Sequence, residues 1–318
     1  MAGGVALAVP GPVQTDPDKL RWGIVSTVKA PLEQVARFAA FYLDMGAHRV
    51  HLHLDLPDPA LAERLSHPRV RVHQCNDAYW AGKPEKLRES HQLRQAFNAT
   101  RIYRISTLDW LAHIDVDEFV LAPGPIKPLL AAADPSATHI AMAPVEMLDT
   151  AGDPHHFKRT GPKAALRQIY PTYGEHVAGG FISTQSPKNI ARTGLDGVRL
   201  GIHALRHHGK VVNTGTHVPG LEIGHAHAPD WETFHRHIMY RLDKGSYRNR
   251  KGRFNPLGGL IKTLLEDGGI PALRHFHTEM SVASPERLDL LDAHDMLVTA
   301  TLDLDAKVAR HFGDIEGK

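Results

Sequence analysis

The sequence "WLAHIDVDEFV", from Trp110 to Val120, places acidic residues directly after an apolar run. The apolar run predicts a core strand, and the alternation of side chains along a strand puts Asp115 and Asp117 on the same side. Two carboxylates so close together repel each other, and a pKa rises, unless a cation lies between them. The stretch therefore predicts a strand end that holds a charged ligand, and the alternative is an acidic turn without one.

The segments on either side alternate between expected strands and helices. Strands are expected over 22–29, 48–57, 69–76, 110–120 and 138–148, and helices over 31–46, 59–65, 85–103 and 125–134. Residues 151–187 are expected to form loops, and further helices are expected over 231–245, 256–266 and 285–312. Strand and helix in such short alternation predict an α/β fold, with a doubly wound, mostly parallel sheet flanked by helices.

The composition excludes several classes of protein. The formal net charge of the 318 residues is only +2, so no global field favours a nucleic-acid partner. The single cysteine, Cys75, excludes an intramolecular disulfide and suits a reducing compartment. No window reaches about 18 uninterrupted apolar residues, which argues against a transmembrane segment. Residues 1–20 are expected to be a flexible arm rather than a signal peptide, so the sequence predicts a soluble, cytoplasmic protein.

The acidic residues fall where this kind of sheet binds ligands. In open α/β sheets, ligands bind beyond the carboxyl ends of the strands. Thr27 and Val28 end the first expected strand, Asp55 ends the second, and Asp115 and Asp117 end the fourth. Carboxylate oxygens suit Mg²⁺ or Mn²⁺, which keep open positions for phosphate oxygens. We therefore expect a divalent cation site beside a phosphate-bearing ligand.

Several segments carry a resemblance to a known family. They are "VSTVKAPLEQVARFAAFYLDMGAHRVHLHLD", "CNDAYW", "LRQAFNAT" and "DWLAHIDVDEF", followed by "SPKNIARTG", "GIHA" and "GHAHAPDWETFHRH". On these segments, residues 21–250 resemble bacterial glycosyltransferase family 2-like proteins, which have the GT-A fold. The resemblance implies one GT-A-like domain over 21–250. Residues 251–318 carry no part of the resemblance and are expected to form a C-terminal helical extension packed on that domain.

The resemblance also implies an activity of the hexosyltransferase type (EC 2.4). A nucleotide-sugar, expected to be a UDP-sugar, would donate its sugar to an acceptor hydroxyl with inversion, and Mn²⁺ or Mg²⁺ would bridge the donor diphosphate. The family's DxD motif corresponds to Asp115 and Asp117. Asp55 would meet the nucleoside, and Arg94 and Gln95 would lie near the donor. The implied late metal ligand is His225, with His227 as the alternative.

The chemistry needs two further kinds of residue. A cation can help to neutralise the leaving diphosphate, and Lys188 and Arg192 are the available pair. A carboxylate should deprotonate the acceptor, and Glu146, with Asp149 second, is the candidate base. The sequence does not identify the acceptor, which could be a glycan, a lipid or a protein, and peripheral contact with a membrane stays open.

Three alternatives stay open beside this reading. The 23 histidines, including His203, His207, His208 and His217 as well as the later "HAH", could form the metal site of a hydrolase. A barrel hydrolase of that kind needs eight βα units, however, and only about five are visible. A nucleotidyltransferase is disfavoured because "STVKAPLEQ" has no glycine after the first strand. The third alternative is an inactive nucleotide-sugar-binding module.

Overall fold

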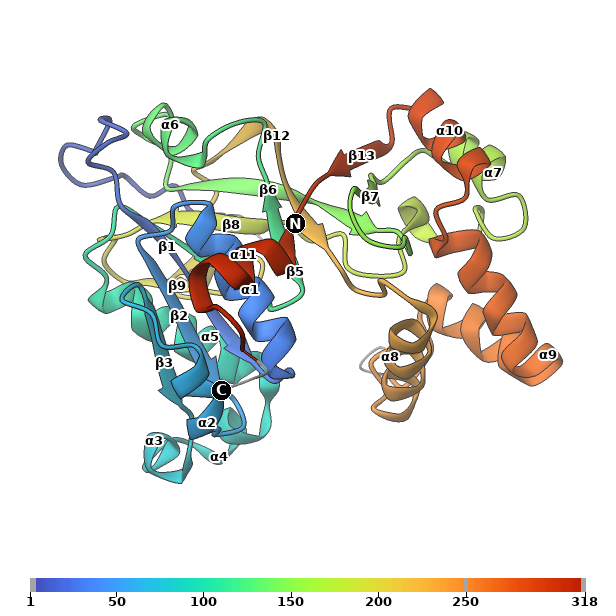
Figure 1. Ribbon diagram of the computed structural model, residues 1–318, viewed down its shortest axis with the longest axis horizontal. Coiled ribbons are helices and arrows are strands. Elements are labelled where there is room, and N and C mark those ends of the chain that lie inside the picture. Colours follow the sequence, from blue (N-terminus) through green and yellow to red (C-terminus); the bar gives the residue numbers. More distant parts are fainter. Residues whose placement is uncertain (1–3, 249–250, 316–318) are drawn as a thin grey trace. The chain divides into compact units, whose positions relative to one another are not determined.

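Strand β1 (Trp22–Val28) is buried along its whole length and is an interior strand of a mixed sheet (Figure 1). In this computed structural model, which describes residues 4–248 and 251–315, β1 pairs in parallel with β2 (Arg49–Leu54) and with β4 (Trp110–His113). Strand β2 pairs in parallel with β3 (Val70–Gln74). The predicted α/β fold is therefore confirmed, with four parallel strands in the order β3-β2-β1-β4.

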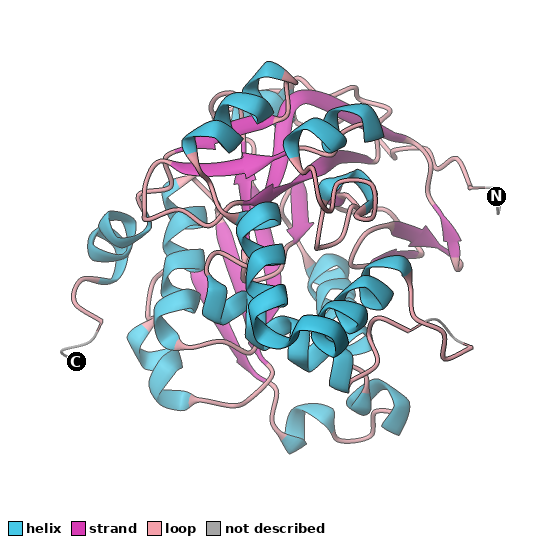
Figure 2. Cartoon of the chain, turned by 90° about the vertical axis from the view of Figure 1, so that its right-hand side faces the viewer, coloured by secondary structure: helices cyan, strands magenta, loops and turns pink. Residues whose placement is uncertain are grey.

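Helices cover both faces of these strands. Trp22 of β1 meets Tyr42 of α1 (Leu32–Asp44), with ring centroids 6.4 Å apart. Val25 packs instead with Ala99 and Ile102 of α5 (His91–Ile105). Because side chains alternate along a strand, these contacts place α1 and α5 on opposite faces. Figure 2 shows the strands with helices on either side, as a doubly wound arrangement requires.

The chain divides into two compact units. The first comprises Met1–Ala143, Ser186–Ile223 and Asp303–Lys318, and the second comprises Pro144–Gln185 and Gly224–Leu302. Strands β6 (His139–Met147) and β12 (Gly215–His225) each run from the first unit into the second. The expected boundary at residue 250 lies outside the described residues.

The first unit continues the sheet beyond β4 with antiparallel strands. Strand β8 (Lys188–Arg192) pairs antiparallel with β4 and with β6. A small separate sheet contains β9 (Val198–Leu200), β10 (Leu205–His207) and β11 (Lys210–Val211). The other elements of this unit are β5 (Glu118–Leu121), α2 (Pro59–Arg64), α3 (Asp77–Trp80), α4 (Glu85–Glu89), α6 (Ile126–Ala131) and α11 (Leu304–Phe312).

The second unit has its own apolar core. It contains β7 (His155–Lys158), β13 (Leu297–Ala300), α7 (Lys163–Ile169), η1 (Ala178–Gly180), α8 (Trp231–Asp243), α9 (Pro256–Ser281) and α10 (Pro285–Ala293). Strand β7 pairs antiparallel with β6 on one side and with β13 on the other. The large buried side chains of this core include Tyr170, Phe234 and Phe276.

Two expected elements are broken into shorter ones. The strand expected over 110–120 is two strands, β4 and β5, because the backbone N–H of Glu118 donates to the carbonyl oxygen of Asp115 (3.0 Å) and closes a turn. The helix expected over 85–103 is α4 followed by α5. The break is at Ser90, whose side chain accepts a hydrogen bond from the backbone N–H of Leu93 and caps α5.

Two other expectations are wrong in the second half of the chain. Residues 151–187 contain β7, α7 and η1 rather than loops alone. The helix expected over 285–312 is α10, β13 and α11, and Asp295 and Asp303 between them take positive φ values of 55° and 47° that a continuous helix does not allow. Strand β13 forms here because β7 offers it a partner strand.

The described part of the expected N-terminal arm contains no helix or extended strand, but it is attached at Val5 and at Leu7, whose backbone N–H donates to the Thr214 hydroxyl (3.4 Å). The backbone N–H of Val5 donates to the carbonyl oxygen of Val211 (2.8 Å), and Val5 forms an isolated parallel bridge with Val212. Among the described residues, we find no helix with the length and apolar character needed to cross a bilayer.

Candidate functional site

The acidic residues lie on a tight turn between β4 and β5, not on a strand as expected. Besides the backbone bond that closes the turn, the carboxylate of Glu118 accepts a hydrogen bond from the backbone N–H of Asp115 (2.8 Å). The alternation argument therefore does not apply to Asp115 and Asp117, because they are held by the turn rather than by a strand.

Lys188 of β8 neutralises part of this turn. Its Nζ lies 2.7 Å from a carboxylate oxygen of Asp115 and 3.0 Å from one of Glu118, and its side chain is buried. Burial works against the charged ammonium, but the carboxylates of Glu118 and Asp115 outweigh it and raise the pKa of Lys188. The sequence predicted a cation beside the acidic groups. For Asp115, the cation beside it in the structure is the ammonium group of Lys188.

The N-terminal part of α5 connects the acidic turn to the end of β2. Gln95 donates to Asp115 from Nε2 (2.7 Å), and the guanidinium of Arg94 donates to both carboxylate oxygens of Asp55 (2.7 and 2.5 Å). Burial opposes ionisation of Asp55, yet the hydrogen bonds from His91 and Arg94 lower its pKa. Five of the predicted donor-site residues, Asp55, Arg94, Gln95, Asp115 and Lys188, thus contact one another in two linked groups.

Thr27 and Val28, at the end of β1, are buried beneath this region. The Thr27 hydroxyl accepts a hydrogen bond from Nδ2 of Asn98 (2.9 Å), and Oδ1 of Asn98 accepts one from the Tyr79 hydroxyl (2.7 Å). Sequence reasoning missed Asn98, although its place three residues after Gln95 puts both on one side of a helix. Thr27 and Val28 therefore support neighbouring side chains, and their predicted contact with a donor stays a prediction.

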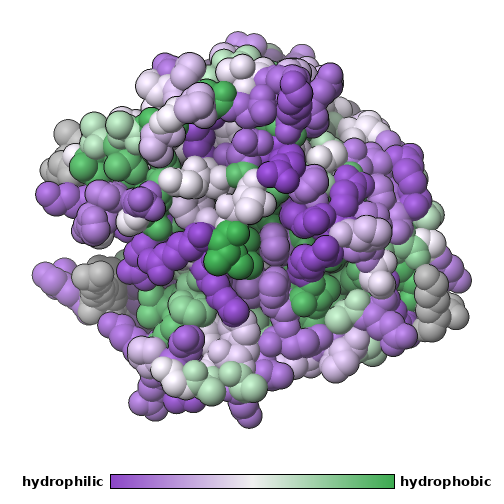
Figure 3. Space-filling view, turned by 90° about the vertical axis from the view of Figure 1, so that its left-hand side faces the viewer, coloured by the Kyte–Doolittle hydropathy of each residue, from purple (hydrophilic) through white to green (hydrophobic). Residues whose placement is uncertain are grey.

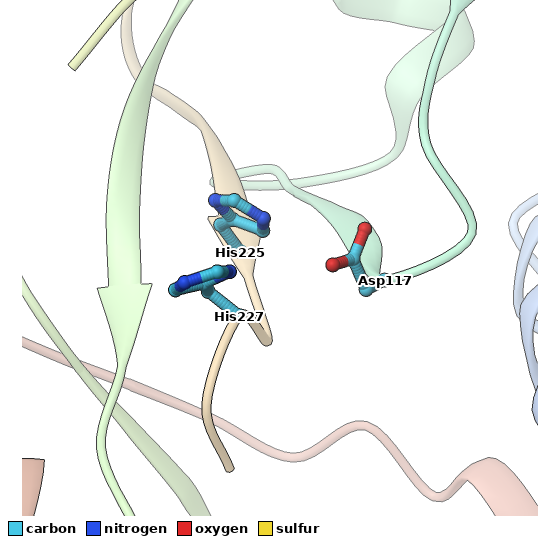
Figure 4. Close-up of side chains that lie close together, drawn as sticks. All are labelled: Asp117, His225 and His227. Carbon is cyan, nitrogen blue, oxygen red and sulfur yellow. The ribbon is translucent and has the colours of Figure 1, made fainter. Parts of the chain in front are cut away.

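Asp117 belongs to a second group, with His225 and His227. Asp117 is the residue before β5, and His225 is the last residue of β12. One ligand atom from each of Asp117, His225 and His227 lies within 4.8 Å of the others. Figure 4 shows the three side chains. No other group of three or more His, Cys, Asp or Glu side chains with this spacing occurs among the described residues.

The donor set of this group fits a divalent metal ion. Burial, and then the positive charges of Arg241, His225 and His237, lower the pKa of His227 well below its ordinary value. Its imidazole is therefore neutral near pH 7, the form in which histidine binds metals. The sequence left open whether His225 or His227 is the late ligand, and the geometry places both beside Asp117.

The two candidate bases lie in different surroundings. Glu146 is buried, and it accepts hydrogen bonds from the backbone N–H groups of Ile182 (3.2 Å) and Ser183 (2.7 Å). Its Oε1 also lies 3.1 Å from Nζ of the buried Lys158. With these three partners, Glu146 has the contacts of a structural carboxylate.

Asp149 is more open to a ligand. Its side chain is 29% exposed, and Nε2 of His277 lies 3.6 Å from its Oδ2. Burial, and then the carboxylates of Asp230 and Glu232, raise the pKa of Asp149. A raised pKa is a property of many general bases, which favours Asp149 over Glu146 for that role. No sequence signal indicated the neighbouring His277.

Arg192 does not join either group. Its guanidinium donates to the carbonyl oxygens of residues 133, 134 and 137 and lies over the ring of Trp110, 4.2 Å from the ring centroid. Of the histidines proposed for a hydrolase site, His225 and His227 are in the metal-ligand group, whereas His203, His207, His208 and His217 are not. Nδ1 of His217 is 2.8 Å from the carbonyl oxygen of Ala141, and the rings of His207 and His208 contact each other.

Comparisons with known proteins do not assign this site. The chain matches no protein-family model, and a search of curated proteins finds no relative. The chemistry must therefore be argued from the geometry.

Proposed function

We propose that this chain is a metal-dependent glycosyltransferase of the GT-A type. It transfers a sugar, with inversion, from a nucleotide-sugar such as a UDP-sugar to an acceptor hydroxyl. The observation that carries the proposal is the group of Asp117, His225 and His227, with ligand atoms within 4.8 Å of one another, next to the turn that also holds Asp115.

The strand order supports a ligand site at this position. The acidic turn follows β4, and Asp55 follows β2, so both lie at carboxyl ends of parallel strands. Open α/β sheets bind nucleotides at this end, where chain direction and strand order leave a crevice. The strands β3-β2-β1-β4 run parallel to one another, and the family resemblance implies a mostly parallel sheet.

Asp117, His225 and His227 would hold the cation, which when bound would act as a Lewis acid on the leaving diphosphate. One carboxylate and two imidazoles favour a transition-metal ion such as Mn²⁺ over Mg²⁺, which prefers oxygen ligands. Asp115 contributes differently: with Lys188 and Gln95 it fixes the turn that carries Asp117.

Two further residues receive roles in this proposal. Asp55 orients Arg94 through two hydrogen bonds, which leaves the guanidinium able to meet an anionic or nucleoside group of the donor. Asp149 accepts the proton of the acceptor hydroxyl, because its raised pKa brings its basicity closer to the operating pH. One such base is enough for a single displacement with inversion.

Thermal unfolding with ligands tests this proposal. The wild-type chain is melted with UDP, GDP and their sugars, each with and without Mn²⁺. We expect stabilisation that requires both the nucleotide and the metal. Asp117→Asn keeps the shape of the side chain but removes its charge, so we expect the metal concentration needed for the shift to rise about tenfold or more.

Asp196→Asn is the matched control, since Asp196 is an exposed carboxylate of the same unit that lies outside the metal-ligand group. Its melting behaviour should equal that of the wild type. An Asp117→Asn variant with an unchanged metal-dependent shift would remove the central role of this group.

A hydrolase is the second candidate, because two histidines and one carboxylate are also a set that binds catalytic Zn²⁺. The same melting experiment separates the two functions. Stabilisation by Zn²⁺ alone, with no response to any nucleotide, would favour the hydrolase over the glycosyltransferase.

A further inference from the structure

A hollow of about 670 Å³ lies on the first unit, on residues that the proposed donor site does not use. Its walls come from α5, from β9 and from the segment that includes α3 and the turn after it. The side chain of Thr100 ties two of these walls together, since its hydroxyl donates to the carbonyl oxygen of Leu200 (3.4 Å). A hollow of this size is in the range of small-molecule sites.

The charges of the hollow have one sign. Lys83, Arg101, Arg104 and Arg199 line it, and no Asp or Glu is among its lining residues. In the described part of the chain, none of these four side chains forms an ion pair with a carboxylate. Other arginines of the first unit do form such a pair, as Arg94 does with Asp55. Four unpaired cations in one hollow attract a multiply charged anion.

Aromatic rings hold two of the cations in place. Arg101 lies over the ring of Tyr79, 5.1 Å from its centroid, and Lys83 lies over the ring of Phe97 at 5.5 Å. Such contacts restrict flexible side chains while leaving their N–H donors available. Figure 3 shows that the side of the molecule on the left of Figure 1 is mostly hydrophilic, interrupted by small hydrophobic patches, and the hollow has the same mixed character.

We propose that this hollow binds a small ligand with two or more phosphate groups, independently of the metal-ligand group. Three of its four cations are arginines, whose planar guanidinium matches phosphate oxygens in pairs. Phosphate groups also carry more charge than carboxylates for the same volume, which suits four cations in one hollow. The ligand is either a free oligophosphate or the phosphorylated headgroup of a lipid.

Calorimetric titration with tripolyphosphate tests the proposal. The full chain is used at low salt with a chelator present, so that the metal-ligand group takes no part and the outcome does not depend on the proposed glycosyl transfer. We expect binding by the wild type. Arg101→Gln with Arg104→Gln should weaken it about tenfold or more, because each charge-assisted hydrogen bond contributes substantially to affinity.

Two controls define the result. Lys127→Gln removes a cation of the same unit that lies outside the hollow, and it should leave tripolyphosphate binding unchanged. Thermal melts show whether each variant is folded, which we expect because Arg101 and Arg104 are exposed and Lys127 is only half-buried. A wild type that does not bind tripolyphosphate, or an equal loss in Lys127→Gln and in the double variant, would overturn the proposal for free oligophosphates.

Vesicles of phosphatidylcholine with and without phosphatidylinositol 4,5-bisphosphate, whose headgroup carries several phosphates, separate the two sources of phosphate. Binding to the anionic vesicles alone that is lost in the double variant would assign a lipid headgroup. Tripolyphosphate binding without vesicle binding would assign a free oligophosphate. If neither tripolyphosphate nor the anionic vesicles bind, the hollow is not a site for small phosphate ligands. Binding of single-stranded RNA without binding of either probe would lead to the same conclusion.

Discussion

At the scale of single residues, Lys188 determines the electrostatics of the acidic turn. It is buried between Asp115 and Glu118, and both carboxylates hold it in the charged form. Replacing Lys188 with Met would leave two neighbouring carboxylates with their main cation removed. We expect a loss of about 3–5 kcal/mol in the free energy of unfolding, measured by urea denaturation.

The double variant Lys188→Met with Glu118→Gln checks that reason. It removes the buried carboxylate together with the cation, so part of the lost stability should return. If the double variant is no more stable than the single one, then lost packing rather than unbalanced charge explains the effect.

The sequence predicted which residues form the candidate site better than it predicted how these residues contact one another. Asp117 and His225 were both expected as metal ligands, and the structure brings them together. The pairing of Asp115 with Lys188 could not be read from the chain, since 73 residues separate them and only the pairing of β8 with β4 makes them neighbours. That the metal is bound stays a prediction.

At the scale of elements, β1 and β2 approach each other closely at Gly23. A Cβ atom there would lie 2.5 Å from the carbonyl oxygen of Arg49 and 2.7 Å from a methyl group of Leu108. We therefore expect Gly23→Ala to force these elements apart and to lower the free energy of unfolding by about 1–3 kcal/mol. Chemical denaturation measures the change.

Gly124→Ala is the matched substitution. Nothing lies within 4 Å of a Cβ at Gly124, so its free energy of unfolding should stay close to that of the wild type. If both alanine variants lose the same stability, the cause is not the close approach of β1 and β2.

Elements with a clear local pattern were predictable, and those that depend on distant partners were not. Helix α1 follows from its apolar spacing, and its buried face includes Val35, Phe38 and Tyr42. The start of α5 after Ser90 also has a local cause, because the Ser90 side chain caps the helix. The apolar pattern alone predicted one continuous helix through this position. Strand β13 has no such local cause. It lies in a segment that looked helical, and only pairing with β7, far along the chain, makes it a strand.

At the scale of the whole molecule, the candidate site depends on strand pairing that joins distant segments. Asp115 and Lys188 meet because β8 pairs with β4, and a one-dimensional pattern does not contain that pairing. The parallel strands β1 to β4 were predictable because they alternate with recognisable helices, whereas their order in the sheet and the antiparallel β8 and β7 were not. Family resemblance, rather than pattern, indicated the late histidines.

Buried histidines make the stability of the molecule depend on pH. Burial, aided by nearby positive charges, lowers the pKa of His51 to about 4 and that of His113 to about 4. Burial and the neighbouring imidazoles of His73 and His51 lower the pKa of His53 to about 2. In the unfolded chain these groups return to about 6.5. Between about pH 6.5 and pH 4 the unfolded state therefore binds more protons than the folded state.

The sign of the effect follows directly. The contribution of these histidines to the free energy of unfolding is fully present above about pH 6.5. As the pH is lowered from about 6.5 towards 4, the free energy of unfolding falls by up to about 1.4 kcal/mol per pH unit for each histidine. Replacing His53 with Asn removes one of these groups, so the difference in unfolding free energy between neutral pH and about pH 5 should shrink by about 2 kcal/mol. His176→Asn, at an exposed histidine, should leave that difference unchanged. Urea denaturation at the two pH values measures both variants. An equal pH dependence in wild type and His53→Asn would mean that His53 takes up no fewer protons in the folded chain than in the unfolded one.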